Sequence, residues 1–358
     1  MDETTLRILD ILSREIGNPL SINELTQKIE KIYGTAHYVN IYDKISLLAN
    51  ENIIMLTKTG RSSIATMNFE NYLLIDLLSE IELKRKQNFL KNKPEVQVVL
   101  MEIDTCLHDI QLVRSITMIN PEKNTKLNRI ELVIHMKKSD DRKVIQKTKI
   151  AIHMIMENLQ KIHNIKVDCL VLESETFLDL LKSNEVNPLR EMLYNKIVVL
   201  YPQDFWIEIR NIIGSGIKIK LEEGETNPAK MAERDLVYNL TRFGYAEFGP
   251  QIKSGRLVCI EYVISTILFH NDARRTGAIP VMLAKNAKKT NYDIILFLSR
   301  KYGYAEKMLG ILRALRNLAA YMKAIVDEPI NLLNILNIEE IKADQKSIKE
   351  AMRLYNVV

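Results

Sequence analysis

The sequence predicts an α+β chain of several domains, and three observations lead to this fold class. In the first 70 residues, three helical patterns precede two short apolar runs that are joined by a polar turn. In the middle of the chain, apolar runs of strand length alternate with helical patterns, and beyond residue 205 helical patterns dominate. Because a domain usually takes about 100–200 residues, 358 residues are enough for more than one. We expect four segments, at residues 1–72, 73–93, 94–204 and 205–358.

The composition excludes several classes of protein. Apolar residues make up 47% of the chain and charged residues 27%, close to the average for globular proteins, and Gly (12) and Pro (9) are scarce. No stretch approaches the roughly 18 uncharged apolar residues of a membrane span, and the acidic start Met1-Asp2-Glu3 argues against a secretory signal. Three cysteines lie far apart without a CxxC pair, which predicts neither a disulfide framework nor a zinc site. We expect a cytoplasmic protein that contacts no membrane and holds no metal or cofactor.

The first 70 residues predict three helices and a β-hairpin. Apolar residues at helical spacing lie in residues 5–16 and 22–32, and a third helix has Ile41, Ile45 and Leu48 on one face. Ser21 followed by Glu24 is the signature of a capping box that opens the second helix. The apolar runs 53–56 and 64–67, on either side of a turn with a glycine, predict the hairpin.

Three helices followed by a hairpin resemble the winged helix-turn-helix family over residues 4–69. In that family the third helix enters the major groove of DNA and the hairpin, or wing, contacts the backbone. The resemblance therefore implies contacts to bases from Tyr38, Asn40, Tyr42 and Lys44, and contacts to phosphates from Lys58 and Arg61. Residues 1–72 hold seven Lys/Arg against nine Asp/Glu, which is unfavourable for binding phosphates. Because winged helices also serve in protein docking and dimerisation, a protein partner or a homodimer stays open beside double-stranded DNA.

The middle of the chain predicts an α/β domain that follows a linker helix at residues 73–93. Strands are expected at residues 109–119, 129–136, 165–172 and 197–200, with helices between them, which together predict a mixed sheet of about four strands. This pattern resembles the minimal nucleotidyltransferase fold, in the version that archaeal proteins append to a winged helix.

The nucleotidyltransferase motif is incomplete in this sequence. The active family has Gly-Ser on a turn, an acidic-x-acidic pair on the next strand and a third carboxylate later, because carboxylates must hold two metal ions beside the nucleotide phosphates. Ser115, Glu131 and Asp168 match the motif, whereas Arg114 and Arg129 replace the glycine and the first acid. Arg129 would repel Mg²⁺ and pair with Glu131 or Asp168 instead, and Arg114 would obstruct the close approach that glycine permits. We expect a degenerate site without catalysis; an active enzyme and a different α/β domain are the alternatives.

The C-terminal segment predicts a basic helical domain. Residues 273–323 hold eleven Lys/Arg against two Asp/Glu, an asymmetry that favours a polyanionic partner. The candidate nucleic-acid contacts are Arg274, Arg275, Lys288 and Lys289. RNA or a protein is a possible partner of this basic domain. The alternative is that its lysines only keep the helix surfaces hydrated and bind no partner. Helices are expected at residues 229–242, 257–269, 272–283, 292–302, 305–326, 330–336 and 338–355.

The function predicted from the sequence is that of a non-enzymatic, DNA-binding transcription regulator. Two alternatives come from other classes. One is an active nucleotidyltransferase or antitoxin-type enzyme that modifies protein or RNA, and the other is a scaffold that uses its domains for protein contacts.

Overall fold

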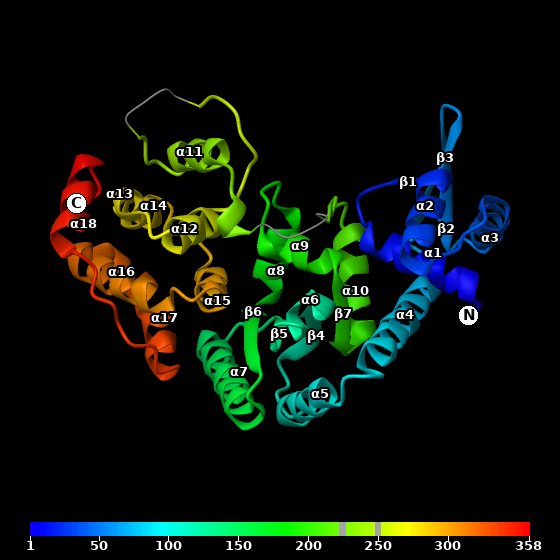
Figure 1. Cartoon of the computed structure of the whole chain (residues 1–358), viewed down its shortest axis with the longest axis horizontal. Helices are drawn as coiled ribbons and strands as arrows, with labels where there is room; N and C mark the ends of the chain where they lie inside the picture. Colours follow the sequence, from blue (N-terminus) through cyan, green and yellow to red (C-terminus); the bar gives the residue numbers. More distant parts are fainter. Residues whose placement is uncertain (222–226, 248–251) are drawn as a thin grey trace. The chain divides into compact units, whose positions relative to one another are not determined.

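The computed structural model describes residues 1–221, 227–247 and 252–358 and has a mixed α+β fold (Figure 1). Within these residues, the strands lie between Leu20 and Leu200, and helices form the later part of the chain. The fold class is therefore confirmed at this level. The chain forms two compact units: Met1–Lys138, Leu172–Lys182 and Leu189–Gly224 make up the first, and Ser139–Val171, Ser183–Pro188 and Glu225–Val358 the second. Because each unit draws on separate stretches of sequence, the units differ from the predicted segments, whose boundaries stay predictions.

Of the strands in the described residues, all but β6 (Lys166–Leu172) belong to the first unit. An element that crosses a boundary belongs to the unit that holds most of its residues. The elements of the first unit are α1 (Glu3–Arg14), β1 (Leu20–Ser21), α2 (Ile22–Tyr33), α3 (Tyr38–Asn50), β2 (Ile54–Thr59), β3 (Ser62–Met67), α4 (Leu73–Leu90), α5 (Pro94–Leu107), β4 (Val113–Ile119), α6 (Pro121–Thr125), β5 (Arg129–Met136), α8 (Ser174–Lys182), α9 (Pro188–Tyr194), β7 (Lys196–Leu200) and α10 (Pro202–Gly214).

The N-terminal three helices and hairpin form as the sequence predicts. The hairpin strands β2 and β3 pair antiparallel, and β1 adds to β3, so that the strand order is β1-β3-β2. The capping box is present, because Ser21 Oγ accepts from the Glu24 N–H and the Glu24 carboxylate accepts from the Ser21 N–H. Ile41, Ile45 and Leu48 are the buried residues of α3, as their spacing indicates.

Helix α4, which the sequence predicts as a linker, belongs to the core of the first unit. It packs against α10, β7 and α1, and Leu74, Ile75 and Leu78 on it are fully buried. Strand β7 in turn pairs antiparallel with β4, and β4 pairs antiparallel with β5. Helix α4 therefore lies between α1 and the paired strands β4 and β7, and it holds the N-terminal helices against that sheet.

The second unit is helical apart from one strand among its described residues. Its elements are α7 (Arg142–His163), β6 (Lys166–Leu172), η1 (Pro228–Lys230), α11 (Glu233–Arg242), α12 (Ile260–Phe269), α13 (Ala273–Thr276), α14 (Ala278–Lys285), α15 (Tyr292–Tyr302), α16 (Ala305–Leu318), η2 (Ala320–Met322), α17 (Lys323–Ile335) and α18 (Gln345–Leu354). Helix α12 packs against α15, α16 against α17, and α14 against α18.

Several predicted bounds are wrong, for reasons that lie outside the local pattern. The strand expected from residue 109 begins only at Val113, because a turn follows α5. Helix α17 continues through Pro329, where a break was expected, since buried residues on both sides of the proline keep the helix packed. The helix expected over residues 338–355 begins only at Gln345, after the cap Asp344. Residues before that cap approach α16 so closely that a side chain at Gly310 would meet the carbonyl oxygen of Ile341.

Candidate nucleic-acid interface

Helix α3 presents the residues that the sequence assigns to base contacts. Tyr38, Asn40 and Tyr42 are exposed, and the rings of the two tyrosines stack with 6.1 Å between their centroids. The exposed face also carries Val39 and Leu47, which are 65% and 54% exposed. This face therefore combines one amide with aromatic and aliphatic side chains.

Lys44, the fourth predicted base contact, is held by an ion pair. Its Nζ lies 2.9 Å from Asp2 Oδ2, and the lysine side chain is only 27% exposed. Asp2 is also the N-cap of α1, where its carboxylate accepts from the backbone N–H of Thr5. The slight burial of Asp2 raises its pKa, but the Thr5 hydrogen bonds and Lys44 outweigh this and hold the pKa well below the usual range. The lysine is thus engaged by a carboxylate that stays ionised.

The two predicted phosphate contacts lie at the end of the hairpin. Lys58 is near the end of β2 and Arg61 is in the turn before β3, next to Gly60, which has a φ of +62°. Both side chains are exposed. A glycine with positive φ allows the tight turn that separates the two strands. The hairpin therefore carries two cations at its tip.

The carboxylates that the sequence matches to the nucleotidyltransferase motif are held in ion pairs. Arg129 Nη1 lies 3.2 Å from Glu131 Oε1, as expected for a cation in place of the first metal ligand, and Glu131 is 0% exposed. Arg114 binds Glu208 of α10 at 2.7 Å. Beside it, the Ser115 hydroxyl is buried, and it has no hydrogen-bond partner in the described part of the chain. In the second unit, Asp168 is buried. It pairs with Lys166 at 3.4 Å and with Arg300 at 3.4 Å.

The two carboxylates that match the motif are already paired with cations. Glu131 and Asp168 each have a cationic partner, and a divalent ion would compete with that fixed charge. Within residues 1–221, 227–247 and 252–358, no three His, Cys, Asp or Glu side chains are grouped so as to hold a metal ion. The side chains present therefore do not fit the two metal ions of the active family.

The helical unit neutralises much of its basic run. Arg275 contacts Glu233, Glu247 and Asp272, and its side chain is only 12% exposed. Further arginines of the run also bind carboxylates, in the pairs Arg300–Glu157, Arg313–Glu340 and Arg316–Asp327. Arg274, Lys288 and Lys289 are exposed. Of the four predicted contacts, Arg275 is therefore already engaged, and the other three keep their charges at the surface.

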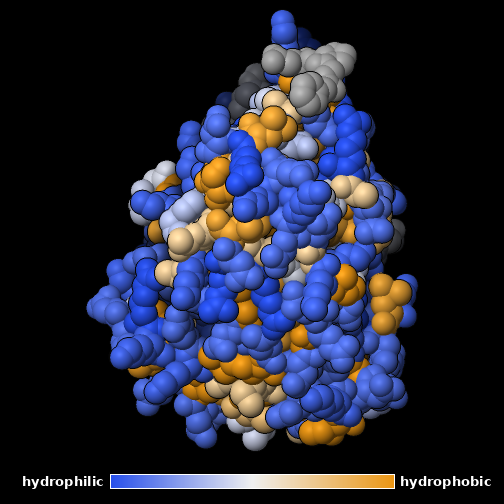
Figure 2. Space-filling model, turned by 90° about the vertical axis from the view of Figure 1, so that its left-hand side faces the viewer, coloured by the Kyte–Doolittle hydropathy of each residue, from blue (hydrophilic) through white to orange (hydrophobic). Residues whose placement is uncertain are grey.

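Figure 2 shows the face on the side of the C-terminal helices, which is mostly hydrophilic. Apolar residues appear on it in several separate areas, between large hydrophilic ones. Hydrophilic surface therefore separates the apolar areas on this face.

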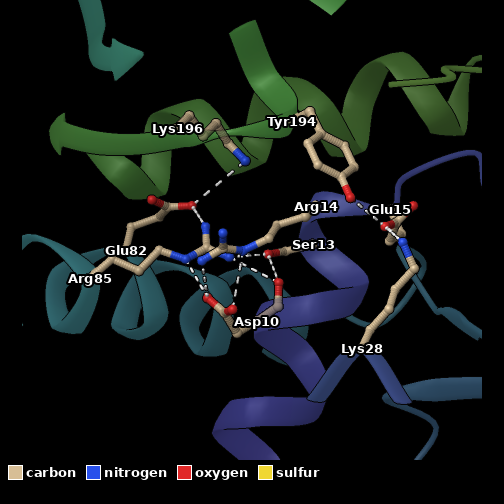
Figure 3. Close-up of polar contacts among 9 residues, drawn as sticks. All are labelled: Asp10, Ser13, Arg14, Glu15, Lys28, Glu82, Arg85, Tyr194 and Lys196. Atoms are coloured by element: carbon tan, nitrogen blue, oxygen red, sulfur yellow. Dashed lines mark hydrogen bonds and ion pairs between the residues drawn. The ribbon is translucent and has the colours of Figure 1, made fainter. Parts of the chain in front are cut away.

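A buried ion network that the sequence did not predict joins α1 to α4 (Figure 3). Arg85 of α4 donates to the carboxylate of Asp10 at 2.5 Å, to Ser13 Oγ at 2.7 Å and to Glu82 Oε1 at 2.6 Å. Burial raises the pKa of Asp10, but Arg85 and then Arg14 more than offset this, so that the pKa lies below its usual value. Asp10 and Glu82 are almost fully buried, which makes this a completed network inside the core.

Lys196 extends the network to β7. Its Nζ lies 3.8 Å from Glu82 Oε1 and 4.9 Å from the ring centroid of Trp206. In the described part of the chain, this amine has no hydrogen-bond partner. Burial lowers the pKa of Lys196 to about 8, although the charge of Glu82 opposes the change. Glu82 also accepts from the backbone N–H of Val198 at 2.9 Å.

A second set of contacts holds the end of α1. Glu15 accepts from Tyr194 at 2.7 Å and from Lys28. The backbone at Ile219 runs so close to Gly17, which has a φ of +79°, that any side chain there would overlap its carbonyl. Both residues of this contact lie in the first unit, so the turn after α1 packs against a segment 202 positions away in sequence.

A cysteine–histidine pair lies in the second unit and was also missed. Cys169 Sγ lies 3.4 Å from His153 Nδ1, and both side chains are buried. Burial raises the pKa of the Cys169 thiol to about 12 and lowers the pKa of His153 to about 3. The nucleophilic form of a cysteine is the thiolate, so this neutral pair is part of the core and is not an activated nucleophile.

No helix in the described residues is both long enough and apolar enough to cross a membrane. Comparison with known proteins found no matching family model, no similar curated protein and no similar solved structure.

Proposed function

We propose that this chain is a cytoplasmic DNA-binding protein that regulates transcription, with residues 1–72 acting as a winged helix-turn-helix. The observation that carries the proposal is the arrangement of the N-terminal elements, with the strand order β1-β3-β2, an exposed α3 and a hairpin tip that bears Lys58 and Arg61. A winged helix-turn-helix binds DNA with an exposed helix in the major groove and a basic hairpin against the backbone, and these elements provide both.

The charge of this segment predicts modest affinity that depends strongly on sequence. Residues 1–72 carry more acids than bases, and Lys44 is already paired with Asp2. Few phosphates can therefore be neutralised, and non-specific binding, which rests on such contacts, is expected to be weak.

The experiment that tests this proposal is a selection from a random duplex pool with the full chain at low salt, followed by fluorescence anisotropy. Asn40→Ala should weaken binding to the selected duplex more than to random duplex, because base contacts carry the sequence information. When both duplexes carry the same flanking sequence, Arg61→Ala should weaken both about equally, since it is expected to contact phosphate. Asn50→Ala, at the exposed far end of the same helix, is the matched control. The absence of any selected sequence, and of binding to the pool, would contradict the proposal.

We also propose that residues 94–204 are a nucleotidyltransferase-like domain without catalytic activity. The Arg129–Glu131 pair and the complete burial of Glu131 support this, since a metal ligand must be free of a competing cation and accessible to the nucleotide. Incubation with each labelled nucleoside triphosphate and Mg²⁺ should leave protein and RNA unlabelled. Transfer of label would favour the alternative of an active enzyme.

A specific observation favours protein docking as a second candidate function. Val39 and Leu47 on α3 are 65% and 54% exposed, and they suit an apolar partner surface, including that of a second copy. Light scattering of the full chain and of the Leu47→Ser variant separates the two candidates. A dimer that Leu47→Ser converts to monomer would place α3 in a protein interface.

A further inference from the structure

The exposed face of α3 lacks the side chains that commonly read guanine. The helix sequence contains no arginine, and its one lysine, Lys44, is paired with Asp2. Arg or Lys bound to guanine O6 and N7 is the commonest specific contact in the major groove. A helix without a free cation cannot make that contact without first breaking the ion pair at 2.9 Å.

The first turn of α3 carries the groups that suit an A·T pair. Asn40 is exposed, and a side-chain amide can bind adenine N6 and N7 at the same time. Val39 beside it is largely exposed and apolar, which suits the C5 methyl group of thymine. Residues at the start of a recognition helix usually reach the base edges, so these two side chains are the ones placed to decide the preference.

One residue of α3 favours a different base. Asp43 is exposed one turn further along, and a carboxylate can accept from cytosine N4. Its negative charge is repelled by the phosphates on both sides of the groove. Because Asp43 follows the first turn of α3, we expect it to influence a different base pair of the DNA site from the one that Asn40 and Val39 contact.

The hairpin tip adds a second reason for the same preference. Arg61 is exposed in the turn between β2 and β3. A·T-rich duplexes have a narrow minor groove whose negative potential attracts arginine. An arginine on a wing beside the recognition helix therefore gains more from A·T-rich flanks than from G·C-rich ones.

We infer that this chain selects A·T base pairs, with Asn40 reading adenine and Val39 contacting thymine in the major groove, and with Arg61 favouring A·T-rich flanks. This inference rests on the proposed DNA-binding function and names the class of duplex that it takes.

The test compares the affinities of the full chain for duplexes of equal length by fluorescence anisotropy. A good base contact discriminates by about 1–3 kcal/mol, so we expect A·T duplexes to bind roughly 5- to 150-fold tighter than G·C duplexes at equal salt. Changes in the DNA leave the protein fold intact. Replacing adenine by 7-deazaadenine removes the N7 acceptor, and replacing thymine by uracil removes the methyl group; each should reduce the preference. Asn40→Ala should abolish the effect of 7-deazaadenine, whereas Asn50→Ala should retain it.

The outcomes separate the inference from the proposed function. Equal binding to A·T and G·C duplexes would overturn the inference while DNA binding stands, and no binding to any duplex would overturn both. An A·T preference that survives both base replacements, and that Arg61→Ala removes, would overturn the assignment to Asn40 and Val39.

Discussion

Replacing Lys196 by methionine should stabilise the protein at neutral pH. Burial lowers the pKa of this lysine to about 8, from an ordinary value near 10.5. Since one pH unit of displacement corresponds to about 1.4 kcal/mol, keeping Lys196 protonated in the folded chain costs about 3 kcal/mol. Methionine is apolar and similar in length, and Glu82 keeps its bonds from Arg85 and from Val198 N–H. We therefore expect Lys196→Met to raise the free energy of unfolding at pH 7 by an amount approaching about 3 kcal/mol.

The pH dependence gives the sign of this effect. Because the unfolded chain binds the Lys196 proton more tightly than the folded chain does, wild-type stability should rise between about pH 8 and about pH 10.5 from this group. In Lys196→Met this rise should be absent, so the difference between variant and wild type should shrink across that range. Differences between the two proteins cancel the titration of other groups.

Urea unfolding followed by fluorescence measures both quantities. Trp206 is the single tryptophan and lies next to the Lys196 amine, so it reports on this part of the core. Lys84→Met, on the surface of α4, is the control and should change stability by less than about 1 kcal/mol. A Lys196→Met variant that is less stable than wild type at pH 7 would refute the reasoning, because it would mean that the attraction to Glu82 outweighs the cost of burial.

Three further predictions concern other charged groups. Arg85→Met should lower the free energy of unfolding by about 3–5 kcal/mol, because it leaves Asp10 and Glu82 buried without their shared cation, and adding Asp10→Asn should recover part of the loss in the same urea titration. Glu261→Gln should become more stabilising as the pH rises above about 4.3. Burial raises the pKa of Glu261, so its neutral carboxyl contributes fully to the stability of the wild type below the pKa of the unfolded chain. That contribution is lost as the pH rises through the pKa of the folded chain. The glutamine amide of the variant does not titrate, and its oxygen can still accept from the Asn291 N–H. Asp2→Asn keeps a good helix cap but releases Lys44. Whichever group it contacts, the freed lysine adds one positive charge near the phosphates, so affinity for random duplex should rise and the salt slope should steepen by about one.

Clear results would contradict each of these three. An Arg85→Met protein as stable as wild type would mean that the network contributes little to the core. A pH-independent difference for Glu261→Gln would show that this carboxyl has the same pKa in the folded and the unfolded chain. Unchanged affinity of Asp2→Asn for random duplex would place Lys44 away from the phosphates.

Elements specified by neighbouring residues were predicted well from the sequence. The Ser21–Glu24 capping box and the β2–β3 hairpin depend on residues within a few positions of each other, and both are present. The strand at residues 129–136 was also correct, because Ile130 and the run Leu132-Val133-Ile134 form an apolar pattern of strand length. The Arg129–Glu131 pair was predicted as one of two possible partners, since both residues lie on one strand two positions apart.

The features that were missed depend on residues far apart in the chain. Arg85 and Asp10 are separated by 75 positions, and α4 therefore looked like a linker with a basic end. The charge count over residues 273–323 included Arg275 and Arg300 but not the acids that neutralise them, since Glu247 and Glu157 lie outside that window. A local count of charge measures composition, whereas the surface charge depends on partners that only the fold brings together.

The same long-range contacts decide how the DNA-binding proposal must be tested. A fragment ending at residue 72 would lack Arg85 and Tyr194, which bind Asp10 and Glu15 of the N-terminal helix region. It would also lose the backbone at Ile219 that packs against Gly17. Carboxylates that the full chain pairs would then face water beside an apolar surface that α4 normally covers. Failure of such a fragment to bind DNA would reflect the loss of its support, so only the full chain gives a valid measurement of what α3 recognises.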